Sequence, residues 1–403
     1  MDHFVVVGGG QAGASLVAKL RTTGFEGRIT LICGEDVPPY QRPPLSKGYL
    51  LGDMELERLF LRSPEFYPDH NIVLRLSTHV SAIDPAAKTV TAGAGEVIAY
   101  DKLALTTGST PRRLPAAVGG DLEGVFTMRD LKDADWLAPE MKPGRHMLVI
   151  GGGYIGLEAA AVAAKSGLKV TLIEMADRIL QRVAAPITSD FFRDLHKGHG
   201  VDIREGIGLM ALTGEGHVRG ADLSDGSHLD VDLVIVGIGI TPNTQLAEAA
   251  GLRIENGIWT DSHGRTSDAH IWAAGDCASL VYHGQRIRLE SVGNAIDQAE
   301  VVAQNMMGGD VAYQPRPWFW SDQYDCKLQI GGLNMGYDAV HLRKAAGESQ
   351  SHWYYKGDEL IAVDAMNDPR DYMVGKRLIE AGKSPSPEVI RDPATDMKAL
   401  LRS

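Results

Sequence analysis

The chain has 403 residues, of which 44% are hydrophobic and 23% charged; this composition excludes a disordered or fibrous protein, and the length suggests two or three domains. Its apolar runs are shorter than the roughly 18 residues of a membrane helix, and the run at residues 4–7 lacks the flanks of a signal peptide, so we expect a cytoplasmic protein without a membrane partner. Forty basic against 52 acidic residues give a net charge of −12, which argues against general nucleic-acid binding.

One pattern occurs twice, first within residues 4–32 and again within residues 147–173. Each copy has a short apolar run, a glycine cluster, an alanine-rich stretch closed by a glycine, and a second apolar run. This order predicts a strand, a glycine turn, a helix and a parallel strand. The runs and glycine clusters are 4–7, 8–13 and 28–32 in the first copy, and 147–150, 151–156 and 169–173 in the second.

Later segments predict further strands and a change of architecture. Apolar runs at 103–105 and 233–236 end at glycine turns, and the prolines that follow, Pro111 and Pro242, are suitable places for the chain to cross between domains. Another short strand is expected to end at residues 273–276. Beyond about Pro315 we expect a hairpin within 352–363 and a helix over 371–380, which together indicate a separate α+β domain.

Both glycine clusters have the form GxGxxG. Glycine allows the tight turn and the close approach of backbone N–H groups to a pyrophosphate at the helix N-terminus. An acidic residue, Glu35 or Glu174, stands just beyond the second strand of each copy, where it can bind a ribose. The Glu174 carboxylate repels the 2′-phosphate of NADP, so we expect NADH rather than NADPH at the second site. The nearby Arg178 is the one feature that works against this preference.

In motif order the chain resembles the two-dinucleotide flavoproteins, and most closely the NADH-dependent ferredoxin reductases that serve bacterial ring dioxygenases and haem monooxygenases. The proline-rich segment at 39–47 and the Trp-Ser-Asp segment within 318–322 are the specific parts of this resemblance. The remaining motifs are the glycine clusters at 8–13 and 151–156, Thr-Thr-Gly at 106–108 and Ala-Gly-Asp at 274–276.

The resemblance implies an α/β fold with two Rossmann-like dinucleotide-binding domains, glutathione-reductase-like, and a C-terminal α+β domain. The FAD-binding domain would be split over residues 1–110 and 242–314, with the NAD-binding domain at 111–241 between its halves. The C-terminal domain would cover residues 315–403 and lie over the flavin.

The resemblance also implies roles for individual residues. Lys47 would contact the flavin near N5, and Glu158 would pair with it; these two are the expected catalytic residues. The implied FAD contacts are Gly8, Gly10, Gly13, Glu35, Arg42, Lys47, Val80, Thr107, Gly108, Asp276, Val292 and Trp320. The implied NAD contacts are Gly151, Gly153, Gly156, Glu158 and Glu174. Arg129, Ile155 and Gly239 are expected to bind a cofactor as well.

Each polar or aromatic assignment has a simpler alternative. Arg42 and Lys47 could be solvated loop cations, and Glu158 could merely favour a helix start. Asp276 could be a turn or cap residue, and Trp320 could be ordinary core.

The cysteines restrict the route of the electrons. Cys33, Cys277 and Cys326 stand alone, without CxxC or CxxxxC spacing, so we expect buried small hydrophobic residues rather than a disulfide or a metal site. Residues 37–51, where related disulfide reductases carry a cysteine pair, contain none. Electrons would then leave the flavin directly for an external carrier.

A two-iron two-sulfur ferredoxin is the expected carrier. Ferredoxins are typically acidic, so a local basic patch near the flavin edge is predicted, with Arg286, Arg288, Arg316 and Trp320 as candidates. Each arginine could instead be a solvated surface group. Two alternatives stay open: a reductase of rubredoxin or another small redox protein, and a flavin-binding signalling protein similar to the apoptosis-inducing flavoproteins.

Overall fold

The computed structural model describes residues 1–344 and 349–402, which pack into two compact units. Unit 1 comprises residues 1–41, 55–110 and 240–317, and unit 2 comprises residues 42–54, 111–239 and 318–403. The chain changes unit near Pro111 and Pro242, where β8 (Ser109–Pro111) pairs with β17 (Ile240–Pro242). The functional division into three domains stays a prediction; residues 42–54, expected in its FAD domain, pack within unit 2.

Unit 1 is built on a five-stranded parallel sheet with the order β19-β7-β1-β2-β3. Successive side chains of a strand point to opposite faces, so Phe4 and Val6 of β1 enter one buried cluster while Val5 and Val7 enter another. The strands are β1 (His3–Val7), β2 (Arg28–Ile32), β3 (Ile72–Arg75), β7 (Lys102–Leu105) and β19 (Ile271–Ala273).

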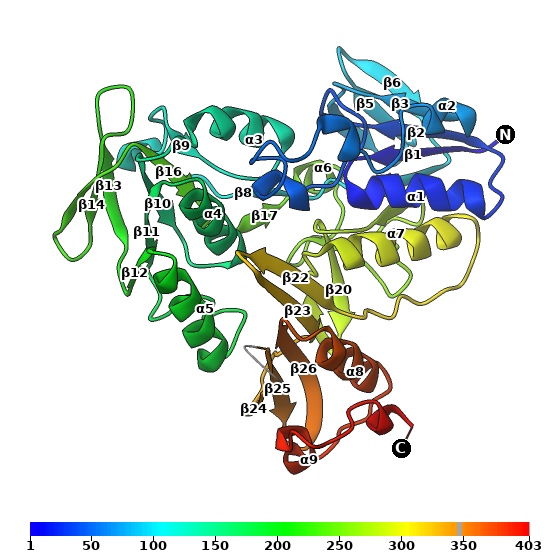
Figure 1. Cartoon of the computed structure of the whole chain (residues 1–403). Coiled ribbons are helices and arrows are strands. Elements are labelled where there is room, and N and C mark those ends of the chain that lie inside the picture. Colours follow the sequence, from blue (N-terminus) through cyan, green and yellow to red (C-terminus); the bar gives the residue numbers. More distant parts are fainter. Residues whose placement is uncertain (345–348, 403) are drawn as a thin grey trace. The chain divides into compact units, whose positions relative to one another are not determined.

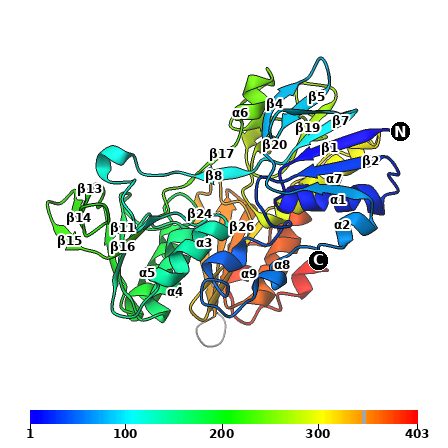
Figure 2. The ribbon, with the colours of Figure 1, turned by 90° about the horizontal axis from the view of Figure 1, so that it is seen from above.

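Different elements cover the two faces of this sheet (Figures 1 and 2). One face carries α1 (Gln11–Thr22) and α7 (Val292–Met306), which pack side by side. The other carries α6 (Gln245–Ala249) and a three-stranded antiparallel sheet. The remaining elements of unit 1 are β4 (Val80–Asp84), β5 (Thr89–Ala92), β6 (Glu96–Ala99), β18 (Ile258–Trp259), β20 (Ala278–Tyr282), β21 (Gln285–Ile287), α2 (Phe66–Asp69) and the short 3-10 helix η2 (Leu56–Arg58).

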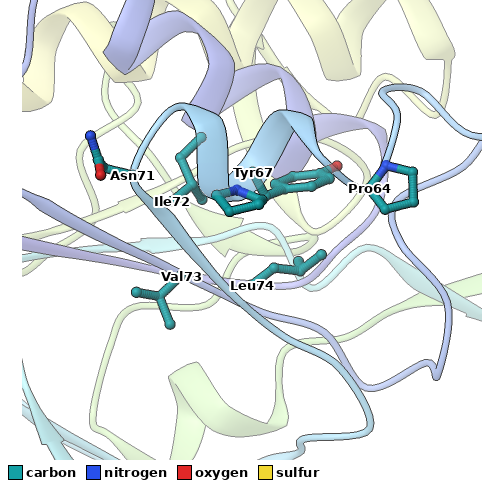
Figure 3. A pocket seen from close by; sticks show the side chains of 7 residues that line it. Pro64, Tyr67, Asn71, Ile72, Val73 and Leu74 are labelled. Carbon is teal, nitrogen blue, oxygen red and sulfur yellow. The ribbon is translucent and has the colours of Figure 1, made fainter.

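An open pocket of about 510 Å³ lies on unit 1 beside α2 and β3 (Figure 3). Its walls are mainly apolar, and no residue in them belongs to the predicted site. The lining residues are Pro64, Tyr67, Pro68, Asn71, Ile72, Val73 and Leu74.

Unit 2 contains a second five-stranded parallel sheet, with the order β12-β11-β10-β16-β9. Its strands are β9 (Val125–Phe126), β10 (His146–Ile150), β11 (Lys169–Glu174), β12 (Asp202–Glu205) and β16 (Leu233–Val236). An antiparallel sheet of β13 (Leu209–Thr213), β14 (Gly220–Leu223) and β15 (His228–Asp230) packs on it through a shared apolar cluster. The helical elements are α3 (Leu131–Leu137), α4 (Tyr154–Lys165), α5 (Pro186–Gly198) and the 3-10 helices η1 (Pro43–Ser46), η3 (Ala116–Val118) and η4 (Ala138–Glu140).

Within residues 318–344 and 349–402 of unit 2, five strands form an antiparallel sheet with the order β22-β23-β26-β25-β24. One face packs on α8 through Trp353 and Val363, and Tyr354 on the other face packs against Ala185. Asp368 caps α8 by accepting from the Asp371 N–H, with Pro369 at the first position. The elements are β22 (Trp318–Gln323), β23 (Cys326–Gly332), β24 (Ala339–Lys344), β25 (Gln350–Lys356), β26 (Glu359–Met366), α8 (Pro369–Glu380), α9 (Pro387–Arg391) and η5 (Ala399–Leu401).

The predicted fold class is confirmed, including both strand–glycine–helix–strand units and the β25–β26 hairpin. The predicted helix over 371–380 is α8, which begins two residues earlier because of its Asp-Pro cap. One detail was wrong: Glu174 is the last residue of β11 rather than a residue beyond it. None of the helices in the described ranges is both long and apolar enough to cross a membrane.

Candidate cofactor and redox site

The glycine turn between β1 and α1 is shaped for a bound group. Gly8 has φ +116°, and a Cβ on it would lie 2.1 Å from the Thr106 carbonyl oxygen; a Cβ on Gly13 would lie 2.0 Å from the Gly8 carbonyl oxygen. A Cβ on Gly10, in contrast, meets no described atom within 4 Å. The first and third glycines therefore serve the backbone, while the second faces open space at the start of a helix, as pyrophosphate binding requires.

The turn between β10 and α4 repeats this geometry in unit 2. A Cβ on Gly151 (φ +106°) would lie 2.4 Å from the Gly237 carbonyl oxygen, and one on Gly156 would lie 2.0 Å from the Gly151 carbonyl oxygen. A Cβ on Gly153 meets no described atom within 4 Å. Ile155, in the first turn of α4, is 45% exposed.

Both predicted ribose acids are held by hydrogen bonds. The Tyr40 hydroxyl donates to Glu35 Oε2 at 2.5 Å. Glu174 accepts from the Gly152 N–H at 2.7 Å through Oε2 and from the Ala176 N–H at 2.8 Å through Oε1. Each carboxylate oxygen has a second lone pair, so Glu174 can fix the glycine turn and still accept from a ribose.

Two further predicted FAD residues of unit 1, Thr107 and Asp276, follow the carboxyl ends of neighbouring strands, the edge at which α/β sheets bind ligands. Thr107 follows β7, and its hydroxyl donates to the Asn243 carbonyl oxygen at 2.7 Å. Asp276 follows β19, and its Oδ2 accepts from Ser109 Oγ at 2.9 Å. Among the remaining FAD residues, Val80 opens β4, Val292 opens α7, and Gly108 (φ +67°) has a conformation that favours glycine. Gly239 (φ +98°), the last residue of a segment of unit 2, also has such a conformation.

A cluster of charged and hydroxyl groups surrounds Glu158 in unit 2. Lys47 Nζ lies 3.2 Å from Glu158 Oε1 and 3.6 Å from Asp322 Oδ2. Ser321 Oγ donates to Glu158 Oε1 at 2.7 Å, and Ser46 Oγ donates to Oε2 at 3.2 Å. Burial raises the pKa of Glu158, while Lys47 and the two serines oppose that shift. Glu158 therefore does more than favour a helix start, and Lys47 is not a freely solvated cation.

The same unit positions Arg42 and the aromatic residues of β22. Arg42 Nη1 donates to the Arg129 carbonyl oxygen at 2.9 Å, so two of the predicted cofactor residues contact each other. Trp320 stacks on Trp318 with ring centroids 5.4 Å apart, whereas Phe319, on the opposite face of the strand, contacts Tyr154. Trp320 remains partly exposed.

The three arginines predicted to form a docking patch differ in their surroundings. Arg286 lies over the Trp259 ring and 3.7 Å from Glu255 Oε1; Arg288 Nη2 lies 2.8 Å from Glu290 Oε1. Their side chains are only 13% and 15% exposed. Arg316 is exposed, so it is the better candidate of the three for contact with a partner.

All three cysteines are buried, which confirms their predicted burial. Burial raises the pKa of Cys33 and of Cys326 to about 12, and burial likewise raises the pKa of Cys277. These thiols stay protonated at neutral pH. Within residues 1–344 and 349–402, His, Cys, Asp and Glu side chains form no group of three or more that could hold a metal ion.

Sequence patterns did not identify the hydroxyl partners of Glu158. Ser46 stands 112 positions and Ser321 163 positions from it in sequence. A signal was present all the same, because both serines belong to the two specific motifs, next to Lys47 and Asp322 respectively.

Residues 2–299 match the family described as pyridine nucleotide-disulphide oxidoreductase, and residues 318–401 match the family described as reductase C-terminal. The chain belongs to the pyridine nucleotide-disulphide oxidoreductases. Putidaredoxin reductase of Pseudomonas putida is 40% identical, over 99% of this chain and 97% of that protein. The ferredoxin reductase subunit of a Sphingobium 5,5'-dehydrodivanillate O-demethylase is 41% identical, over 99% of both chains.

Structural comparison gives the same family. A solved covalent complex of putidaredoxin reductase with putidaredoxin has a chain that superposes with a TM-score of 0.96 at 40% identity, covering 100% of this chain and 98% of that one. Several relatives of the chain are ferredoxin reductases of oxygenase systems. The predicted resemblance to the ferredoxin reductases is therefore confirmed.

Proposed function

We propose that this chain is an FAD-dependent NADH:ferredoxin reductase that delivers single electrons to a two-iron two-sulfur ferredoxin serving a monooxygenase or dioxygenase. The observation that carries the proposal is similarity over the full length, C-terminal part included, to reductases named for such carriers. The two glycine turns and the Lys47–Glu158 cluster support it.

The residues present fit two dinucleotides. Open space over Gly10 and over Gly153, each at a helix start, suits a pyrophosphate in unit 1 and in unit 2. Glu35 and Glu174 would each hold a ribose. Asp276 and the first turn of α7 would hold the rest of FAD. When bound, the cofactors supply hydride transfer and the release of single electrons, chemistry that side chains do not provide.

Lys47 would be the cation that stabilises negative charge on the reduced flavin. The Glu158 and Asp322 carboxylates pair with the Lys47 ammonium group and fix its position. The prolines of the preceding η1 segment restrict the backbone that carries it. The chain thus supplies a fixed positive group instead of a mobile one.

Two observations support the preference for NADH: the negative charge of Glu174 and the hydrogen bonds that already engage Arg178. Glu174 presents negative charge where a 2′-phosphate would lie. Arg178 donates to Ser189 Oγ at 2.5 Å and to the Ala184 carbonyl oxygen at 2.9 Å, so its guanidinium is engaged at the start of α5. Arg178, the cation that works against the preference for NADH, is therefore already bound by the protein.

The proposal is tested by NADH-driven reduction of a two-iron two-sulfur ferredoxin, followed by visible absorbance, with NADPH in a parallel reaction. Fast bleaching of the ferredoxin with NADH is expected, and slow bleaching with NADPH. If the flavin is reduced but the ferredoxin is not, the acceptor is wrong and rubredoxin is tried next. A flavin that is reduced slowly, and reoxidised slowly by every redox protein, would instead favour the signalling alternative. The cytoplasmic location stays a prediction.

A further inference from the structure

A continuous line of polar side chains runs through unit 2 from Glu158 to the end of β22. Ser321 Oγ lies 2.7 Å from Glu158 Oε1, and Gln323 Nε2 lies 3.1 Å from Ser321 Oγ. Gln323 Oε1 lies 2.8 Å from His196 Nε2 on α5. His196 Nδ1 lies 3.3 Å from the Tyr324 hydroxyl. The line therefore joins α4, β22 and α5.

The middle of this line is closed to solvent. Ser321, Gln323 and His196 are each 0% exposed, so their polar atoms must be satisfied by one another. The outer end is nearer the surface, where the Tyr324 ring stacks on His199 with centroids 3.6 Å apart. Burial lowers the pKa of His196 to about 4, so the imidazole is neutral at pH 7 and carries a single N–H.

With the Gln323 amide oriented as in the structure, these constraints give the line one direction. The Gln323 carbonyl oxygen can only accept, so His196 Nε2 must be the protonated nitrogen and Nδ1 must accept from the Tyr324 hydroxyl. The Gln323 amide nitrogen then donates to Ser321 Oγ. Ser321 has one hydrogen, and it is left for Glu158. Every donor points toward the carboxylate.

The reverse direction is distinguishable. With the amide turned over, Ser321 would donate to Gln323, His196 would carry its proton on Nδ1, and Glu158 would lose its shortest hydrogen bond. An ionised Glu158 favours the first arrangement because hydrogen bonds to a charged acceptor are stronger than those to a neutral one.

We propose that Gln323, His196 and Tyr324 are positioning residues that hold the Ser321 hydroxyl as a donor to Glu158 and so keep this carboxylate ionised beside Lys47. The inference rests on the proposed function, in which the Lys47–Glu158 pair belongs to the redox site.

The charges around the pair explain why one hydroxyl matters. Lys47, at the end of η1, is the positive group that faces Glu158, and it is shared with Asp322 on β22. Ser46 contributes a longer hydrogen bond. The groups that face His196 are His199 on α5 and Tyr324 after β22. Because burial raises the pKa of Glu158 and Ser321 opposes this shift, loss of the Ser321 donor must raise it further.

The test is an infrared titration of the purified flavoprotein without NADH or ferredoxin, in which the Glu158 carboxyl band is assigned by its loss in E158Q. We expect the midpoint to rise by roughly one pH unit in S321A, because the ionised carboxylate loses a hydrogen bond and one unit corresponds to about 1.4 kcal/mol. Q323M should raise it in the same direction by a smaller amount, and Y324F by less again. Y355F is the matched control, because it removes another partly buried tyrosine hydroxyl bond in unit 2, to the Pro385 carbonyl oxygen, and should leave the midpoint unchanged.

An unchanged midpoint in Q323M overturns the proposal; if that variant does not fold, Y324F decides in the same way. The ¹⁵N spectrum of histidine-labelled wild-type protein gives an independent answer. A proton on His196 Nε2 supports the proposed direction, and a proton on Nδ1 overturns it. Neither measurement involves an electron acceptor, so failure to reduce a ferredoxin would overturn the proposed function alone.

Discussion

Lys47 and Glu158 form a nearly buried ion pair, which makes the stability of the protein dependent on pH. Side chains of Lys47 and Glu158 are 20% and 8% exposed. Burial raises the pKa of Glu158 in the folded protein, so the folded state holds this proton to higher pH than the unfolded state does. Stability from this group is therefore full at low pH and declines as pH rises through the raised pKa.

Removing the positive charge of Lys47 should make the stability of the folded protein fall more steeply as pH rises. In K47M the carboxylate loses the opposing charge, so we expect a loss of about 1–3 kcal/mol in the free energy of unfolding at pH 9 and a smaller loss at pH 6, because a larger fraction of Glu158 is protonated at the lower pH. Urea unfolding at both pH values measures it. In the double variant K47M/E158Q, the loss of stability should be nearly the same at pH 9 and pH 6. An equal loss for K47M alone at both pH values would contradict the conclusion that Lys47 stabilises the ionised form of Glu158.

Glu174 should determine the choice of coenzyme. E174Q removes the negative charge but keeps an oxygen that can accept from the Gly152 N–H. We expect kcat/KM for NADPH to rise about tenfold relative to NADH, since the repulsion of the 2′-phosphate is lost. Steady-state kinetics with both coenzymes measure it, and R178Q is the control, because Arg178 is engaged with Ser189 and should not alter the ratio. An unchanged ratio in E174Q would place the ribose elsewhere.

At the scale of single residues, the sequence predicted the Lys47–Glu158 pair but not the polar residues that surround it. Lys47 and Glu158 were found because each stands at a fixed place in a recognisable motif. Gln323 and His196 carry no such pattern, and a lone buried histidine or glutamine is usually ordinary core. Their contact spans 127 positions, so only the packing of α5 against β22 reveals it.

At the scale of the element, different glycines of one turn serve the backbone conformation and the ligand space. Gly156 is required by the backbone, because a Cβ there would lie 2.0 Å from the Gly151 carbonyl oxygen. Gly153 has φ −80°, which any residue adopts, and open space beside it. The turn therefore contains one glycine for folding and one for the ligand.

A matched pair of variants tests this separation. G153A should fold with an unchanged Tm but raise the KM for NADH about tenfold, because the methyl group fills the space that a pyrophosphate needs. G156A should lower Tm by several degrees through the backbone clash. Thermal unfolding and steady-state kinetics measure the two effects. Equal Tm values for both variants, or an unchanged KM in G153A, would contradict the assignment of the turn.

At the level of single elements, the sequence predicted the two strand–helix–strand units, whose signals are local. It missed the antiparallel strands β4 to β6, whose burial depends on packing between segments distant in sequence. The β1–α1–β2 and β10–α4–β11 units follow from apolar runs and glycines that are adjacent in sequence. The short antiparallel strands β4 to β6 have no such signal. Their burial comes from packing on the face of the sheet opposite α1 and α7, which no local pattern encodes.

The whole molecule carries a net charge of −12, so the proposed binding of an acidic ferredoxin would depend on a local basic surface. Arg286 and Arg288 are poor candidates for it, since their guanidinium groups are bound to Glu255 and Glu290 and little exposed. Reversing either charge would place two carboxylates together and destabilise unit 1. A loss of ferredoxin reduction in those variants would therefore not identify a docking site.

Arg316 allows a cleaner experiment because it is exposed. If it contacts the ferredoxin, R316E should slow ferredoxin reduction about tenfold at low ionic strength, since rim charges act mainly on the association rate. The deficit should shrink at 0.5 M salt, where the Debye length falls below about 5 Å. Ferricyanide, which needs no protein docking surface, should be reduced at the wild-type rate, and R316Q should lie between the two. An equal loss with both acceptors would show damage to the redox site, and no loss with either would remove Arg316 from the docking surface.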